Sequence, residues 1–205
     1  MKNTKEKILD TALILFNEKG LPKVTLRTIA KEMGISQGNL NYHFKKREHI
    51  IEALYFQLVE NISLDMTRNL SENIDLGFIF KISNAIMHHF FEYRFFMLDF
   101  VQIMREHQSI KSHYLQLSAL RESQFTGLFN ALIETGILRQ EELPNEYLFL
   151  YKRFQILGDF WISSAEVVNQ QVNKNTISKY SEILSQAIYP YLTKKGKINY
   201  NNLIN

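Results

Sequence analysis

The sequence predicts an all-α protein in which a small helix-turn-helix head is joined by a long helix to a larger helical domain. After residue 75, glycine and proline are scarce and apolar residues recur at helical spacing. Residues 24–44 read as a helix, a tight turn and a second short helix. We therefore expect a head at 1–48, a helical domain at 49–193 and a mobile basic tail without periodicity at 194–205.

The first helix of the head is expected at residues 4–19. Its apolar side chains recur at helical spacing and therefore share one face. They are Ile8, Ala12, Leu15 and Phe16. Gly20 and Pro22 follow and end this helix.

Two short helices, separated by a turn of three or four residues, are expected next. Thr25 can cap the first, which should end near Met33. Gly34 stands where a left-handed residue stops a helix without a Cβ clash, and Ser36 can cap the second helix. The second helix, 37–44, is too short and too polar to serve packing alone.

The polar side chains of this region suit double-stranded DNA. Asparagine and glutamine match the edge of adenine, while tyrosine, lysine and arginine suit phosphates. Lys46 and Arg47 stand at the start of another helix, where amide groups and positive charge favour phosphate. The candidate DNA-binding residues are Thr25, Arg27, Thr28, Ser36, Gln37, Gly38, Asn39, Asn41, Tyr42, His43, Lys46 and Arg47.

The distribution of charge supports the same interpretation. The net charge of the chain is +3, but residues 1–50 hold ten Lys or Arg against five Asp or Glu. Residues 51–192 hold eleven against sixteen. Positive charge is thus concentrated in the head, as expected of a DNA-binding protein, although a basic face that meets only water is the alternative.

In combination, the residues of the head resemble the DNA-binding domain of the TetR family of bacterial regulators. The matching residues are Ala12, Leu15, Phe16, Gly20, Thr25, Ile29, Ala30, Gly34, Ser36, Gly38, Leu40, His43, Phe44 and Glu48. Two positions depart from the family pattern: Asn41, followed by Tyr42, stands where tyrosine is usual, and Arg47 replaces lysine. Asn41 can therefore read a base instead of a phosphate. The resemblance covers roughly the first 50 residues and implies a ligand pocket in the C-terminal domain.

A long helix at 46–69 should link the head to this domain, since at ~1.5 Å per residue it is over 30 Å long. Its apolar stripe consists of Ile50, Ile51, Leu54, Leu58, Ile62 and Met66. Pro144 is expected in the first turn of a later helix, and Pro190 should kink the last one. The later helices are expected at 75–92, 95–106, 109–136, 144–169 and 175–194.

Phenylalanine and methionine crowd the segment 86–104. Such side chains can line an adaptable cavity, although an ordinary aromatic core is the alternative. The candidate ligand-binding residues are Met87, Phe90, Phe91, Tyr93, Phe96, Phe100 and Met104. His89, Tyr93 and Asp99 are candidates for a polar rim. The expected ligand is a small hydrophobic or aromatic molecule, neutral or weakly charged, because a buried unpaired charge costs several kcal/mol.

The last two helices resemble an interface between subunits. The helix at 144–169 is apolar on nearly every side, and the final helix carries apolar residues at spacings of three and four. The candidate dimer-interface residues are Phe160, Trp161, Ile177, Tyr180, Leu184, Ala187 and Tyr191. A core helix buried within a monomer is the alternative.

These observations predict a cytoplasmic, homodimeric, ligand-responsive regulator that binds a palindromic DNA operator, and a repressor by analogy with the family. The other class considered is a cytosolic helical ligand-binding or scaffold protein without a DNA role. No phosphate loop, nucleophile elbow or paired acid and base indicates an enzyme, and no cofactor is expected.

Metal and membrane sites are not expected either. His88 and Glu92 stand four residues apart, but no other spacing supports a closed metal site. The absence of cysteine suits a reducing cytosol. The N-terminal apolar run is interrupted by Asp10 and does not read as a signal peptide. Later apolar runs of four or five residues are too short to span a bilayer.

Overall fold

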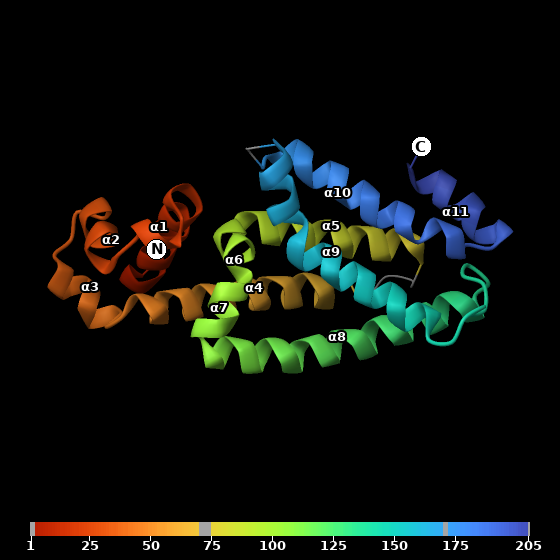
Figure 1. Ribbon diagram of the computed structural model, residues 1–205, viewed down its shortest axis with the longest axis horizontal. Coiled ribbons are helices and arrows are strands. Elements are labelled where there is room, and N and C mark those ends of the chain that lie inside the picture. Colours follow the sequence, from red (N-terminus) through yellow and green to blue (C-terminus); the bar gives the residue numbers. More distant parts are fainter. Residues whose placement is uncertain (1–2, 70–74, 170–171, 205) are drawn as a thin grey trace.

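The computed structural model describes residues 3–69, 75–169 and 172–204. Every regular element in these ranges is a helix, and one isolated antiparallel bridge joins Leu138 to Leu192. Figure 1 shows an elongated molecule with α1 (Thr4–Lys19), α2 (Leu26–Glu32) and α3 (Gln37–His43) at one end and the other helices beside and beyond them. The predicted all-α class is confirmed.

The head is built as its local signals predict. Thr25 and Ser36 cap the second and third helices with their hydroxyls, and Asn3 caps the first. Gly34 has φ +66°, the left-handed conformation expected for the turn. The helices of the head are α1 (Thr4–Lys19), the short 3-10 helix η1 (Leu21–Lys23), α2 (Leu26–Glu32) and α3 (Gln37–His43).

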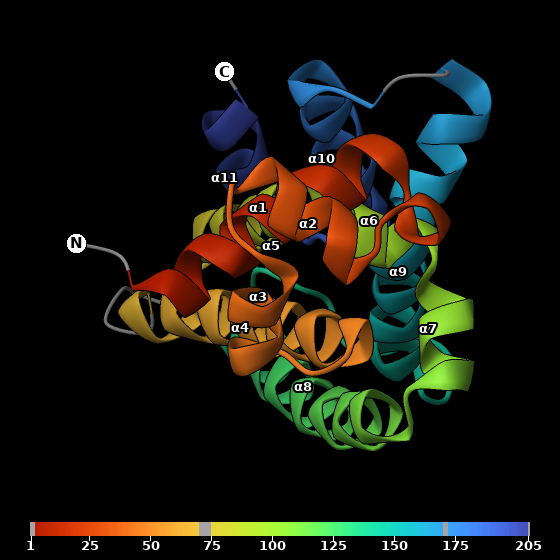
Figure 2. The same cartoon turned by 90° about the vertical axis from the view of Figure 1, so that its left-hand side faces the viewer.

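The remaining helices form the second domain. Seen from the head end, α4 and α8 lie on one side and α10 and α11 on the other (Figure 2). They are α4 (Arg47–Asn69), α5 (Leu76–Glu92), α6 (Arg94–Leu98), α7 (Phe100–Glu106), α8 (Gln108–Glu134), α9 (Glu146–Asn169), α10 (Lys174–Ala187), the 3-10 helix η2 (Tyr189–Tyr191) and α11 (Lys194–Ile204).

Helix α4 belongs to both parts of the molecule. Its apolar stripe is buried, with Ile50, Leu54 and Leu58 at most 3% exposed. The helix packs against α1 in the head and against α5 and α8 in the second domain. A displacement of α4 therefore moves groups in both.

The prediction of a single helix at 95–106 is wrong, because the helix is interrupted at Asp99, which separates α6 from α7. Phe95, Phe96 and Met97 are consecutive and all at most 3% exposed, which one straight helix on a surface cannot achieve. The turn at Asp99 (φ −102°, ψ 18°) redirects the chain, so that Phe100 and the rest of α7 reach a different part of the core.

Pro144 is not in the first turn of a helix, as was expected, but in the turn before α9. The helix begins at Glu146, after Asn145 with φ +60°, a conformation that asparagine tolerates. Glu146 receives two hydrogen bonds from Arg139, of 2.8 and 2.9 Å, and one from the amide of Glu142. This ion pair fixes the start of α9.

The end of the chain also differs from expectation. Helix α10 stops at Ala187, and Pro190, which has no amide hydrogen, lies in η2 instead of kinking a longer helix. Residues 194–205 were expected to be a mobile tail, but Lys194–Ile204 form α11. Tyr200 is 4% exposed and contacts the rings of Phe80 and Tyr189 at 5.5 and 5.1 Å, so tertiary packing stabilises a helix that its sequence does not signal.

Candidate DNA-binding surface and internal cavity

Helix α3 presents polar side chains outward from a buried apolar base. Leu40 and Phe44 are 0% and 4% exposed and anchor the helix on the head. Tyr42 is 84% exposed, and His43 is half-buried. The residues on either side of Leu40 are exposed: Ser36, Gln37, Gly38, Asn39 and Asn41. The structure thus brings Gln37, Asn39 and Asn41, whose side-chain amides suit base edges, together on one exposed surface.

The other predicted DNA-binding residues fall into two groups, those that are exposed and those whose side chains make contacts inside the head. Arg27 and Lys46 are exposed beside this surface. Thr25 and Thr28 cap α2 reciprocally, so their hydroxyls already make internal hydrogen bonds of 2.8 to 3.2 Å. Arg47 is turned inward.

The guanidinium of Arg47 donates hydrogen bonds to the carbonyls of Leu21 and Val24, at 3.0 and 3.4 Å. These bonds join the start of α4 to the loop before α2. Arg47 therefore holds the head together, which differs from the phosphate contact expected of it.

Asn17 of α1 attaches the head to the second domain, and sequence reasoning missed it. Its side-chain Nδ2 donates to the carbonyl of Glu92 at 2.7 Å, and its Oδ1 accepts from the amide of Phe95 at 3.0 Å. The Glu92 carbonyl and the Phe95 amide lie at the end of α5 and the start of α6, where backbone groups have no partner within their own helix. Phe16, the neighbour of Asn17, stacks on Phe95 with ring centroids 5.0 Å apart.

An internal cavity of about 180 Å³ lies between α4 and the helices α5–α9. Its wall includes Phe90, Phe96 and Phe100, three of the seven predicted ligand-binding residues. The remaining lining residues are Tyr55, Leu58, Val59, Ile62, Ile86, Met97, Tyr114, Leu117, Ser118, Arg121, Phe125, Tyr151, Phe154, Gln155, Gly158 and Asp159.

The other four predicted ligand-binding residues do not line the cavity. Met87 is buried and accepts a hydrogen bond from Ser181 of α10, and Phe91 lies under the guanidinium of Arg94. Tyr93 is buried beside Asn61, and Met104 packs at the edge of the core. Successive helical residues point about 100° apart, so on α5 the face that carries Phe90 cannot also carry its neighbours.

The predicted rim is also wrong, because polar groups of α8 and α9 take its place. His89 pairs with Asp65 at 2.8 Å, and neither it nor Tyr93 nor Asp99 lines the cavity. The polar residues that α8 and the middle of α9 contribute to the cavity wall are Tyr114, Ser118, Arg121, Gln155 and Asp159, and the hydroxyl-bearing Tyr55 and Tyr151 line it as well. The sequence does contain a signal for these polar wall residues, since Gln155 and Asp159 interrupt an otherwise apolar helix at a spacing of four.

A hydrogen-bond network joins most of these groups. The Tyr114 hydroxyl donates to Asp159 Oδ2 at 2.6 Å, and the Gln155 amide donates to Ser118 Oγ at 2.7 Å and to Tyr114 at 3.2 Å. Burial raises the pKa of Asp159 to about 6. Burial also lowers the pKa of Arg121, which donates to Ser63 and Gln124.

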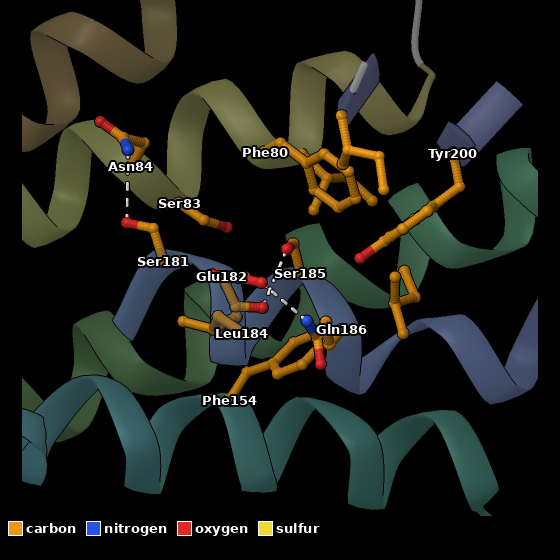
Figure 3. A pocket seen from close by; sticks show the side chains of 13 residues that line it. Phe80, Ser83, Asn84, Phe154, Ser181, Glu182, Leu184, Ser185, Gln186 and Tyr200 are labelled. Atoms are coloured by element: carbon orange, nitrogen blue, oxygen red, sulfur yellow. Dashed lines mark hydrogen bonds between the residues drawn. The ribbon is translucent and has the colours of Figure 1, made fainter. Parts of the chain in front are cut away.

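Two further hollows lie nearby. One, of about 460 Å³ between α4, α5 and α8, shares Leu117, Arg121 and Phe125 with the internal cavity. The other is a groove of about 490 Å³ beside α11, where Figure 3 shows Asn84 of α5 directed toward Ser181 of α10, to which it donates a hydrogen bond. None of its described lining residues belongs to α4, so a molecule bound there has no direct contact with the helix that reaches the head.

The predicted dimer seam is largely the inside of the protomer. Trp161 and Ile177 are each 1% exposed, and Leu184 and Tyr191 each 8%. Tyr180 packs on the indole of Trp161, with ring centroids 5.3 Å apart, and Ala187 is half-buried. The apolar face of α10 meets α5 and α9 of its own chain, so the predicted interface between subunits on this face is wrong. Phe160, 41% exposed, is the exception.

A different apolar face of α9 is exposed. It carries large apolar side chains that are 41% to 84% exposed. They are Phe149, Ile156, Phe160 and Val167. Within the described residues, no helix is both long and apolar enough to cross a membrane, and no three His, Asp or Glu side chains gather as metal ligands.

The fold and the exposed polar surface of α3 define a helix-turn-helix DNA-binding protein whose second domain contains a cavity. The chain belongs to the TetR family of bacterial transcriptional regulators. The family model for the N-terminal domain, "Bacterial regulatory proteins, tetR family", matches residues 8–54, and the model described as "Bacterial transcriptional repressor" matches residues 57–200. The family resemblance seen in the head is thereby confirmed.

Known proteins similar to this chain are regulators of the same kind. The uncharacterized HTH-type transcriptional regulator TtgW of Pseudomonas putida is 32% identical over 69 residues, which are 34% of this chain and 52% of that protein. IcaR of Staphylococcus aureus, a negative regulator of a biofilm operon, is 26% identical over 166 residues, covering 76% of this chain and 84% of its own length. A TetR-family regulator from Marinobacter aquaeolei has the same fold, with a TM-score of 0.85 and 20% identity over 98% of this chain and 97% of that one.

Proposed function

We propose that this protein is a homodimeric repressor that binds a palindromic DNA operator through α3 and is released by a small-molecule effector bound in the cavity beneath α4. The observation that carries the proposal is that α4 joins the two sites: it begins at the base of the head and forms part of the cavity wall through Tyr55, Leu58, Val59 and Ile62. The negative regulation described for IcaR supports a repressor.

Recognition of DNA is assigned to the exposed residues of α3. Gln37, Asn39 and Asn41 carry side-chain amides that pair with base edges in the major groove. Tyr42 and Lys46 reach phosphates and set the register of the helix on the duplex. Two heads related by a dimer axis would read half-sites about one turn of DNA apart, or a multiple of it.

Dimerisation is assigned to the exposed face of α9. Phe149, Ile156, Phe160 and Val167 are separated by seven, four and seven residues, which is the repeat of a helix that packs against a partner helix. Such a large apolar surface is stable in water when a second copy covers it. Phe160→Glu should therefore yield monomers in analytical ultracentrifugation.

The matched control is Leu115→Glu on α8, where a leucine that is 58% exposed, against 41% for Phe160, lies outside this face. It should sediment as the wild-type dimer does. Dimeric Phe160→Glu protein, or monomers from both variants, would contradict this assignment of the interface.

Release of DNA requires that the effector favour one position of α4 over another. A ligand with equal affinity for the two states does not change the equilibrium between them, however tightly it binds. A hundredfold loss of operator affinity needs a difference of about 3 kcal/mol between the two states. By reciprocity, operator DNA must weaken effector binding by the same factor.

The operator can be found by selection from a random duplex library with the purified full-length protein. We expect enrichment of one palindromic sequence, and Asn39→Ala or Asn41→Ala should change the bases selected while leaving non-specific binding nearly intact. Asn202→Ala, an exposed substitution in α11, should select the wild-type site. If the protein enriches no sequence, it does not bind a specific operator, and the alternative of a helical ligand-binding or scaffold protein is favoured.

A further inference from the structure

The cavity contains a positive charge whose partners in the protein are all neutral. Arg121 projects from α8, where its guanidinium donates to Gln124 Oε1 at 2.8 Å and to Ser63 Oγ at 3.1 Å. Among the described residues, no carboxylate forms an ion pair with it. A guanidinium has five N–H donors, so three stay available in this half-buried position. Because removing an unpaired charge from water is costly, the site favours an anion that restores the balance.

The position of Arg121 suits a ligand that carries its charge at one end. Arg121 lines both the internal cavity and the larger hollow beside it, so it lies where the two meet. The internal cavity, of about 180 Å³, is of the size that accepts one aromatic ring, and its walls are mainly phenylalanine and aliphatic side chains. An apolar body placed inside would therefore leave its charged group at Arg121.

The polar wall of the cavity carries a cation, Arg121, at one end and a carboxylate, Asp159, at the other. Asp159 accepts one hydrogen bond from Tyr114 through Oδ2, and its Oδ1 has no partner among the described residues. Tyr114 and Arg121 are seven residues apart on α8, roughly 10 Å at ~1.5 Å per residue. A carboxylate repels a second anion and accepts from a donor, so the two ends fix the direction of a bound ligand.

We propose that the effector is a small organic acid with a compact apolar body, bound with its carboxylate on Arg121 and a hydroxyl or amino donor on Asp159. This assignment rests on the proposed function, because it names the chemistry of the ligand for the same cavity. It departs from the neutral or weakly charged molecule expected from the sequence, since a neutral ligand would leave the half-buried Arg121 without a counter-ion.

The test uses three related compounds and isothermal titration calorimetry with the full-length protein. The compounds are 3-(4-hydroxyphenyl)propanoate, its uncharged primary amide, and 3-phenylpropanoate, which lacks the phenol. The acid should bind about tenfold or more tightly than the amide, because a hydrogen-bonded charge pair replaces neutral contacts. 3-Phenylpropanoate should bind more weakly than 3-(4-hydroxyphenyl)propanoate, but by a smaller factor than the one that separates the acid from its amide.

Variants then assign this preference to the two residues. Arg121→Gln should lose the preference for the acid while its affinity for the amide stays the same, and Asp159→Asn should reduce the gain from the phenol. Arg121→Gln removes an unpaired charge, so it is expected to melt at the wild-type temperature or above, and Arg121→Lys should keep part of the preference. Arg105→Gln, an exposed arginine in α7, is the matched control and should bind as the wild type.

Equal affinity for acid and amide, no saturable binding of the acid at millimolar concentration, or an acid preference that survives in Arg121→Gln would overturn the proposal. Operator binding is measured separately in the same samples. If the acid binds at Arg121 but leaves operator affinity unchanged, the anion site stands and the proposed regulation fails. If the acid does not bind while operator DNA does, the DNA-binding role stands and this ligand class fails.

Discussion

Asn17 offers a sharp test of how the head is held to the second domain. Its side-chain amide bridges the last carbonyl of α5, on Glu92, and the amide of Phe95 in α6, at 2.7 and 3.0 Å. Asn17→Ala removes both hydrogen bonds and leaves two helix-end groups without these partners. Each such bond contributes roughly 0.5–1.5 kcal/mol, so the variant should lose roughly 1–3 kcal/mol of unfolding free energy.

A functional consequence follows from the position of Phe96, which lines the cavity next to Phe95. If ligand binding moves the α5–α6 junction, Asn17 transmits that movement to α1. The variant should therefore bind operator DNA but respond less to the effector. Urea denaturation gives the stability, and fluorescence anisotropy of labelled operator, with and without effector, gives the response.

Two further substitutions make the comparison specific. Asn17→Asp keeps the acceptor for the Phe95 amide but points a carboxylate oxygen at the Glu92 carbonyl, so it should lie between Asn17→Ala and the wild type in stability. Asn202→Ala changes an exposed asparagine in α11 and should behave as the wild type. Wild-type stability together with a wild-type effector response in Asn17→Ala would refute the reasoning.

Three other predictions address the DNA surface, the turn and the cavity. Neutralising the exposed Lys46 with glutamine should weaken binding to all DNA sequences alike and lower the salt slope of log K by about one; an unchanged slope would remove Lys46 from the phosphate contacts. Gly34→Val should lose operator binding and at least about 1–2 kcal/mol of unfolding free energy, because φ is +66° there and a side chain is strained even where space is available. Gly127→Ala, in an open position of α8, should instead raise the unfolding free energy of the protein by roughly 0.5–1 kcal/mol in the same denaturation assay. Burial raises the pKa of Asp159 from 3.8 to about 6, so the contribution of Asp159 to stability should be greatest below about pH 4 and fall by about 3 kcal/mol as pH rises through 6. Asp159→Asn should abolish this part of the decline, and an unchanged pH profile would contradict it.

The sequence by itself determined the features that depend on neighbours along the chain. Thr25 and Ser36 cap helices through hydrogen bonds to residues three positions on, and Gly34 ends α2 through its own backbone conformation. The apolar repeats of α1 and α4 were readable for the same reason, because the spacing that buries a helical face is local. These signals, with the charge of the head, were enough for the fold class and for the surface of α3.

The tertiary structure decided everything that depends on which faces meet. A periodic apolar stripe indicates that a face is buried but not what covers it, so the sequence does not distinguish the face of α10 with Ile177 and Leu184, which is buried in its own protomer, from a contact with a second subunit. The pairing of Tyr114 with Asp159 joins residues 45 positions apart, and the hydrogen bonds of Asn17 span 75 and 78. Helix α11 exists where a short polar segment finds a surface for Tyr200. Such contacts are set by the relative placement of helices, which no local pattern encodes.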